Sequence, residues 1–268
     1  MPNIVQVILI ALVAGAVGTA VGGGIGVLVK KPSKSYIGYM LGFAAGAMIG
    51  VSLFELLPEA LEHGDEMFAG GGILAIIVGL ALGVLFVFLF EPKRKRAENP
   101  LGVSESLPGG MNAQEAQKHS EQKKFKRLGI AVFIAIILHD FPEGLAIGAG
   151  AHVGNALLFG AVLLLHNIPE GLAIAVPLKA SGMKNFKIIA ICFAAGLPTL
   201  LGAVIGYFIG MVDWLLAYTF AFAAGVMLYI VFSEMLPTSY EYAKDKRLLP
   251  VFILLGAVVL IVFATLLH

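Results

Sequence analysis

Long uninterrupted apolar stretches are the feature that most restricts what this chain can fold into. Each stretch is about as long as the 20 or so helical residues that cross a hydrocarbon core. The stretches are continuous runs rich in Leu, Ile, Ala and Gly, not short alternating segments, so they predict helices and exclude a transmembrane barrel. We expect eight such helices, at about residues 4–29, 36–60, 70–90, 128–150, 155–178, 186–210, 214–236 and 249–267.

Composition supports a chain that is solvated by lipid. Hydrophobic residues make up 59% of the 268 residues and charged residues only 13%, whereas about half of a soluble domain is apolar. The single cysteine, Cys192, excludes a disulfide within the chain and a cysteine-based metal cluster. A net charge of +1 gives no indication of a nucleic-acid partner. The sequence therefore predicts an all-α integral membrane protein.

The basic residues predict how the chain is oriented. If the helices alternate in direction, all 18 Lys and Arg residues fall on one side, in the segments 30–35, 91–127, 179–187 and 238–248. Basic loops are retained in the cytoplasm. We therefore predict a multi-pass protein of a prokaryotic plasma membrane with both termini outside and a flexible cytoplasmic loop at 91–127. The first apolar stretch lacks the basic start of a signal peptide, and we expect it to be a retained helix.

An internal repeat joins two of the expected helices. Phe43–Glu62 reads FAAGAMIGVSLFELLPEALE, Phe222–Glu241 reads FAAGVMLYIVFSEMLPTSYE, and nine of the twenty positions match. A weaker match at an offset of 180 links the first and sixth helices through Ala14, Thr19, Gly22, Ile25 and Gly26 with Ala194, Thr199, Gly202, Ile205 and Gly206. The matching helices are expected to run in opposite directions, as in inverted-repeat transporters. We therefore predict a 3+2+3 inverted-repeat bundle.

A third repeat carries polar groups into the middle of two apolar stretches. HDFPEGLAIG spans His139–Gly148 and HNIPEGLAIA spans His166–Ala175. The two predicted helices are consecutive and therefore antiparallel. A twofold axis in the membrane plane would bring the two motifs together near the midplane, where secondary transporters bind their substrates. Because ionisable groups are costly at this depth, the motifs are expected to be functional.

Helical spacing places the polar residues of each motif on one face. We predict a metal site formed by His139, Asp140, Glu143, His166, Asn167 and Glu170. Imidazole with carboxylate suits Zn, Fe, Mn, Co or Cd better than Ca or Mg, which prefer oxygen, or Cu(I), which prefers sulfur. Three carboxylates in a low dielectric need a cation or protons for neutralisation, so metal and protons are expected to compete. The alternative is a hydrogen-bonded structural pair on each helix, which duplication at matching depth disfavours.

Three further carboxylates are candidates for a transport pathway. Glu55 and Glu234 are equivalent in the long repeat and are expected toward opposite sides of the membrane, and Glu59 follows Glu55 by one turn. The alternative is that they are helix-end carboxylates near the interface.

The predicted site indicates transport of divalent transition-metal ions, with zinc as the first choice. Two other functions are considered. An intramembrane metal-dependent hydrolase would also hold zinc with His and Glu, but its HExxH signature is missing. Buried carboxylates and imidazoles also serve proton or monovalent-cation channels. The two histidines favour a metal.

These motifs resemble those of the ZIP family of metal transporters, in its prokaryotic, GufA-like branch. The resemblance rests on HDFPEG at 139–144, HNIPEG at 166–171, ELLPEALE at 55–62 and the eight-helix layout. It implies a transporter and not an enzyme, with influx of zinc, and often iron, manganese or cadmium, no cofactor besides the transported metal, and a homodimer. It also implies a primary site and an adjoining one. The primary ligands would be His139, Glu143, His166 and Glu170, with Asp140 and Asn167 joining the two glutamates at the adjoining site.

This chain departs from the family pattern in three places. Asp140 stands where many relatives have Asn, which adds a carboxylate to the site. Leu197 and Pro198 replace a Glu-Pro pair, which removes a ligand expected at the second site and weakens the expectation of a two-metal centre. The long loop holds only His119 where the family has a His-rich segment, so metal sensing by that loop is not expected.

Overall fold

The computed structural model describes residues 2–30, 32–90, 113–151, 156–209 and 212–267. These ranges are almost entirely helical and contain no β-strand. The elements are α1 Ile4–Leu12, η1 Val13–Val17, α2 Gly18–Val27, α3 Lys34–Val51, η2 Ser52–Leu56, α4 Leu57–Asp65, α5 Gly71–Phe90, α6 Ala113–Gly150, α7 Ala156–Ala180, α8 Asn185–Ala195, α9 Leu197–Ile209, α10 Asp213–Ile230, η4 Val231–Met235, α11 Leu236–Tyr242 and α12 Leu249–Leu267. Each η element is a short π-helical turn within a longer helix.

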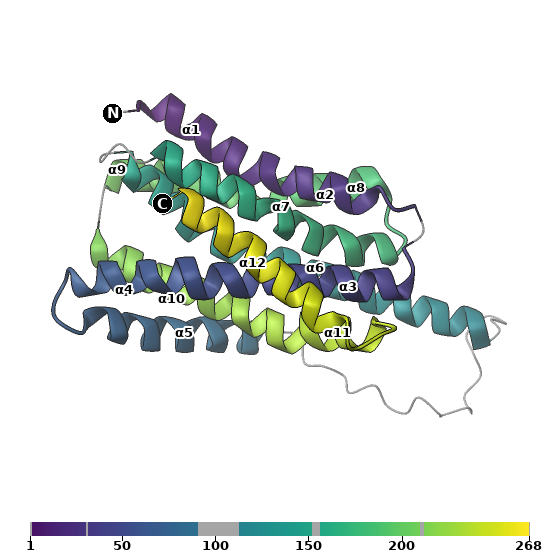
Figure 1. Cartoon of the computed structure of the whole chain (residues 1–268). Coiled ribbons are helices and arrows are strands. Elements are labelled where there is room, and N and C mark those ends of the chain that lie inside the picture. Colours follow the sequence, from purple (N-terminus) through teal and green to yellow (C-terminus); the bar gives the residue numbers. More distant parts are fainter. Residues whose placement is uncertain (1, 31, 91–112, 152–155, 210–211, 268) are drawn as a thin grey trace.

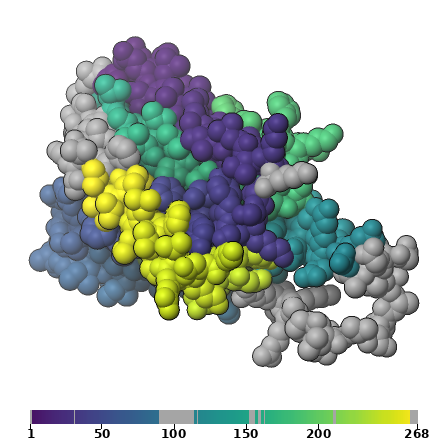
Figure 2. All heavy atoms as spheres, turned by 45° about the vertical axis from the view of Figure 1, so that its right-hand side comes forward, coloured from purple at the N-terminus to yellow at the C-terminus, as the bar shows by residue number. Residues whose placement is uncertain are grey.

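Six helical segments of the described chain are long and apolar enough to cross a membrane. They are Ile4–Val27, Lys34–Asp65, Gly71–Leu89, Gln117–Gly150, Asn185–Ile209 and Asp213–Tyr242. Large apolar side chains such as Phe88 and Leu254 are about two-thirds exposed, at 65% and 64%, as expected of surfaces that face lipid. In Figure 2, α12 lies across the outside of the molecule. The all-α membrane class is confirmed, and the total of eight spanning helices stays a prediction.

The helices form two groups of packed partners. In one group α2 packs on α7, α6 packs on both α9 and α7, and α1 lies on α9. In the other group α3 packs on α12 and α10 packs on α5. Figure 1 shows the two groups side by side, with α3 and α10 antiparallel and α6 and α7 antiparallel.

Equivalent glycine contacts show that the two halves pack in the same way. Gly171 of α7 lies against the Thr19 carbonyl, and Gly144 of α6 lies against the Thr199 carbonyl, so closely that a Cβ would clash with backbone in both places. Thr19 and Thr199 are partners in the predicted repeat. The same holds in the second group, where Gly83 lies on the Phe222 carbonyl and Gly256 on the Phe43 carbonyl. Small residues permit this close approach of membrane helices.

Two prolines in repeated positions coincide with the π-helical turns. Pro58 and Pro237 each stand at the second residue of a helix, directly after η2 and η4. A proline has no N–H to continue the preceding hydrogen-bond ladder, and a π-helical turn accommodates the interruption. Glu55 and Glu234 lie within these turns, so the proline of each repeat fixes where its glutamate points.

The structure corrects three predicted boundaries, one of which is the end of the seventh predicted helix, which continues past residue 236 to Tyr242. Residues 113–127 belong to the continuous helix α6, not to a loop, while 91–112 lie outside the described residues. Strong helix formers fill this segment, and two ion pairs, Lys34–Glu121 and Lys124–Glu241, hold it to the rest of the bundle. The second predicted helix also continues past residue 60, because α4 ends at Asp65.

The ends of the chain agree with an even number of crossings. α1 begins and α12 ends toward the same end of the bundle, and the starts of α3 and α8 lie toward the other end (Figure 1). Lys34 is the first residue of α3 and Lys184 directly precedes α8, so both basic residues lie toward this other end. Which end faces the cytoplasm stays a prediction from the positive-inside rule.

Candidate metal centre

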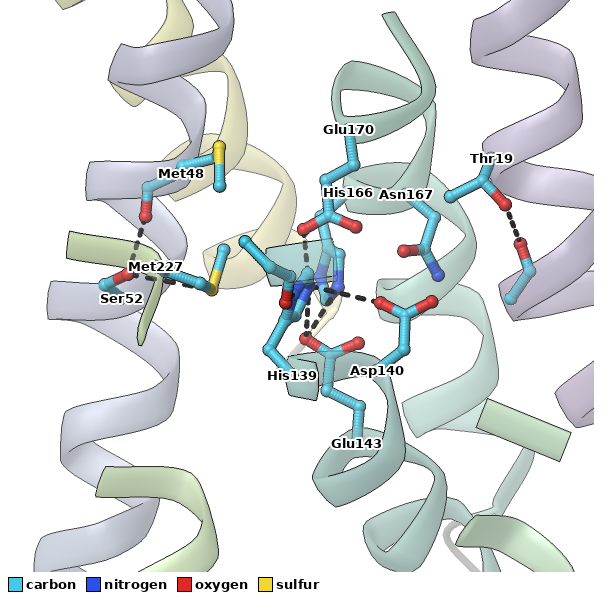
Figure 3. A network of polar contacts seen from close by, with 12 residues as sticks. Thr19, Met48, Ser52, His139, Asp140, Glu143, His166, Asn167, Glu170 and Met227 are labelled. Carbon is cyan, nitrogen blue, oxygen red and sulfur yellow. Dashed lines mark hydrogen bonds and ion pairs between the residues drawn. The ribbon is translucent and has the colours of Figure 1, made fainter. Parts of the chain in front are cut away.

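Two antiparallel helices carry all six predicted ligands. α6 presents His139, Asp140 and Glu143, and α7 presents their counterparts His166, Asn167 and Glu170. All six side chains are at most 2% exposed. Both motif prolines, Pro142 and Pro169, lie inside unbroken helices. The i, i+4 spacing of His and Glu therefore sets both groups on one face of each helix, and the two faces meet between α6 and α7 (Figure 3).

His139 is surrounded by carboxylates. Its Nε2 atom lies 2.8 Å from Glu170 Oε1 on the opposite helix, 3.2 Å from Asp140 Oδ1 and 3.7 Å from Glu143 Oε1. Its Nδ1 atom lies 3.2 Å from the Ala135 carbonyl, which can accept the proton of that nitrogen. When Nδ1 carries the proton, the lone pair of Nε2 is directed at the surrounding carboxylates and can bind a cation together with them.

His166 has a matching arrangement with a different outer partner. Its Nε2 atom lies 3.1 Å from Glu143 Oε1 on the opposite helix. Its Nδ1 atom lies 3.6 Å from Glu55 Oε2, which comes from the π-helical turn η2. Each imidazole thus faces the glutamate of the other helix, so the contacts cross between α6 and α7.

The asparagine and aspartate of the two motifs differ in their surroundings. Asn167 donates from Nδ2 to the Ala14 carbonyl at 2.9 Å, within η1. Both carboxylate oxygens of Asp140 are buried without a hydrogen-bond partner, as are both of Glu143, Glu170 Oε2, Asn167 Oδ1 and Thr199 Oγ1. Buried polar atoms are normally paired, so this concentration of buried acceptors suits a positively charged ligand.

Electrostatics leads to the same conclusion. Three carboxylates at 2% exposure or less are strongly unfavourable unless they are neutralised. Ligand atoms of His139, Asp140 and Glu170 lie within 4.8 Å of one another, a spacing that one ion can bridge. One imidazole with two carboxylates is a donor set suited to zinc and its neighbours in the first transition row.

The comparison with known families identifies the fold and its class of cargo. The sequence profile of the family described as ZIP Zinc transporter matches residues 91–264. The chain belongs to the ZIP family. The match includes both ligand-bearing motifs on α6 and α7, so the resemblance noted from the sequence is confirmed. ZIP proteins are transporters, and the buried His and carboxylate group fits a metal site.

Several curated relatives cover nearly the whole ZIP chain. A protein named Zinc transporter ZupT from Chlorobium limicola is 35% identical over 254 residues, with 91% of each chain covered. Proteins of the same name from Clostridium perfringens and Streptococcus mutans are 33% and 34% identical, covering 91% and 84% of this chain. The expected placement in the GufA-like branch stays a prediction.

The three predicted pathway residues lie in different surroundings in this ZIP structure. Glu55 is brought to the site, next to His166. Glu234 lies instead 3.6 Å from the Arg127 guanidinium. Glu59 is not part of the site: its Oε2 lies 3.6 Å from His63 Nε2, near the end of α4.

Sequence reasoning missed three groups, of which the Ala14 carbonyl contacts the site through Asn167. The Ala14 carbonyl is a backbone group that no side-chain pattern reveals. The buried hydroxyl of Thr199 could have been found, because Thr199 is the repeat partner of Thr19. Arg127 was assigned to a loop, and only the upstream extension of α6 brings it to Glu234.

Proposed function

We propose that this chain moves Zn²⁺ through the membrane into the cytoplasm by binding it between α6 and α7. The ligands proposed for the ion are His139, Glu143, His166 and Glu170, with Asp140 beside them. Relatives named zinc transporters over about nine-tenths of the chain support this cargo. The direction of transport, into the cytoplasm, follows from the family resemblance. The positive-inside rule predicts which end of the bundle faces the cytoplasm.

The crossed pairing of the two motifs carries the proposal. His139 meets Glu170, and His166 meets Glu143, at 2.8 and 3.1 Å. Two structural His–Glu pairs would need only these contacts. Two charged imidazoles would offset only two of the three buried carboxylates of Asp140, Glu143 and Glu170, and one uncompensated buried charge costs several kcal/mol. A divalent cation removes this cost.

The repeated π-helical turns suggest how an ion reaches and leaves the site. Glu55 contacts the site through His166. Its repeat partner Glu234 lies beside Arg127 of α6. We assign Glu55 to the outer side of the path and Glu234 to the cytoplasmic side, with Glu59 further out. Inverted repeats of this kind support alternating access.

Uptake of radioactive zinc into proteoliposomes tests the proposal. The variants are Glu143→Ala and Glu170→Ala, and Glu115→Ala is the matched control because Glu115 is an exposed glutamate of the same α6 helix. Removing one member of a buried charge pair costs about 2–5 kcal/mol. We therefore expect at least a 30-fold loss for the two site variants and none for the control. Competition with iron, manganese, cadmium and magnesium ranks the metals.

Two outcomes would count against the proposal. Unchanged uptake in both site variants would mean that the polar residues between α6 and α7 have a structural role and do not bind the transported ion. A folded, intact protein that takes up no zinc but conducts protons would favour the channel alternative.

A further inference from the structure

A groove on the outside of the bundle has a composition that the transport site does not explain. One face of α6 forms its first wall, with side chains at positions three and four residues apart. The wall residues are Lys123, Lys126, Arg127, Ile130, Ala131 and Ile134. Ile230 of α10 and Glu234 of η4 form the opposite wall, and the open groove between the two walls has a volume of about 350 Å³.

The groove changes from charged to apolar along its length. Its three cations lie within five residues at one end, and four apolar side chains follow. Lys123 and Ile134 are 11 positions apart on a continuous helix, which corresponds to about 16 Å at 1.5 Å per residue. This length is close to the roughly 15 Å that one leaflet contributes to a hydrocarbon core of about 30 Å. The charged end is the one nearer the start of α6, which lies toward the same end of the bundle as the starts of α3 and α8 (Figure 1).

We propose that this groove is a binding site for an anionic phospholipid of the cytoplasmic leaflet. Lys123, Lys126 and Arg127 would bind the phosphate of the headgroup, and an acyl chain would lie on Ile130, Ile134 and Ile230. Charge complementarity argues for this occupant, because the described residues that line the groove include three cations and one carboxylate. Basic pockets between membrane helices on the cytoplasmic side bind anionic headgroups in this way.

The one carboxylate in the groove would compete with the lipid. Arg127 Nη2 lies 3.6 Å from Glu234 Oε1, so a phosphate that binds Arg127 draws it away from Glu234. Bound lipid would thereby release the glutamate that we assign to the cytoplasmic side of the path. This last consequence rests on the proposed function, whereas lipid binding itself does not.

Native mass spectrometry of the purified full-length protein tests binding without measuring transport. Phosphatidylglycerol and phosphatidylcholine are added separately to the intact chain and to a Lys123→Gln/Lys126→Gln variant. The matched control is Lys184→Gln/Lys187→Gln, which removes two exposed lysines of the same side, at the start of α8. Each lysine near an anionic surface contributes about fivefold to binding, so we expect phosphatidylglycerol binding to weaken roughly 25-fold in the groove variant only.

A third variant gives an effect of opposite sign. Glu234→Gln removes the competing carboxylate, and we expect it to bind phosphatidylglycerol more tightly than the intact chain does. Three results would overturn the proposal: equal binding of both lipids by the intact chain, equal loss in the groove and control variants, or displacement of the lipid by millimolar inorganic phosphate. The last result would identify a site for a soluble anion. None of these measurements depends on zinc uptake, so failure here is distinct from failure of the transport site.

Discussion

The contact between Gly171 and α2 gives the sharpest test of how the ligand-bearing helices are packed. A Cβ on Gly171 would overlap the Thr19 carbonyl oxygen and lie 2.8 Å from its carbon and 2.9 Å from Gly23 N. All three atoms belong to backbone, which cannot rotate away as a side chain can. Gly171→Ala must therefore push α7 and α2 apart.

The size of the effect follows from comparison with a glycine in open space. Gly24, also in α2, has no heavy atom within 4 Å of its Cβ position. Alanine gains up to about 1 kcal/mol over glycine in a helix, and this gain is common to Gly171→Ala and Gly24→Ala. Overpacking costs about 1–3 kcal/mol. The difference in unfolding free energy between the two variants should therefore lie in that range, with Gly171→Ala the less stable.

Unfolding in mixed micelles with increasing SDS, followed by circular dichroism, measures this difference. Gly144→Ala supplies an internal check, because its Cβ would lie 2.8 Å from the Thr199 carbonyl carbon and 2.9 Å from Ala203 N. The repeat predicts equal destabilisation at Gly144 and Gly171. Equal midpoints for Gly171→Ala and Gly24→Ala would refute the close packing of α7 on α2.

Three further predictions concern other parts of the molecule. Asp140→Asn removes a charge 3.2 Å from His139 Nε2, and zinc affinity measured by calorimetry should fall about 10–100-fold; unchanged affinity would exclude Asp140 from the site. Lys34→Ala breaks an ion pair with Glu121 in which the lysine is 59% exposed, so SDS unfolding should change by less than about 1 kcal/mol, and a larger change would show that the pair anchors α6. Cys192 is fully buried, so maleimide should label it only as fast as the protein unfolds, and rapid labelling of the folded protein would contradict its burial.

The helical fold was predictable because lipid imposes simple requirements on the sequence. A spanning segment must be long, apolar and internally hydrogen-bonded, so most predicted helix cores match the structure. The boundaries were less predictable where helices continue beyond the hydrocarbon. The polar segment 113–127 satisfies no hydropathy criterion, yet it remains helical and contributes Lys124 and Arg127 to ion pairs with other helices.

The site was predictable to the extent that its ligands repeat. His139 with Glu143 and His166 with Glu170 follow from helical spacing and duplication, and the structure brings them together. The contact of Glu55 with His166 depends on where the π-helical turn points the glutamate. The hydropathy pattern carries no information on the direction in which this turn points Glu55. The hydrogen bond from Asn167 to the Ala14 carbonyl likewise depends on the crossing of two helices far apart in sequence.

The difference between the contacts of Glu55 and Glu234 indicates how the two repeats could move during transport. Glu55 and Glu234 occupy equivalent positions in equivalent π-helical turns, yet Glu55 lies beside a site histidine and Glu234 beside Arg127. Their different contacts therefore mark one state of a pseudo-symmetric molecule. In an alternating-access transporter the two halves exchange conformations, so the opposite state should separate Glu55 from His166 and bring Glu234 toward His139. We predict that the Arg127–Glu234 contact breaks in this transition, because Arg127 and His139 are 12 positions apart on α6 and therefore lie on different faces of that helix.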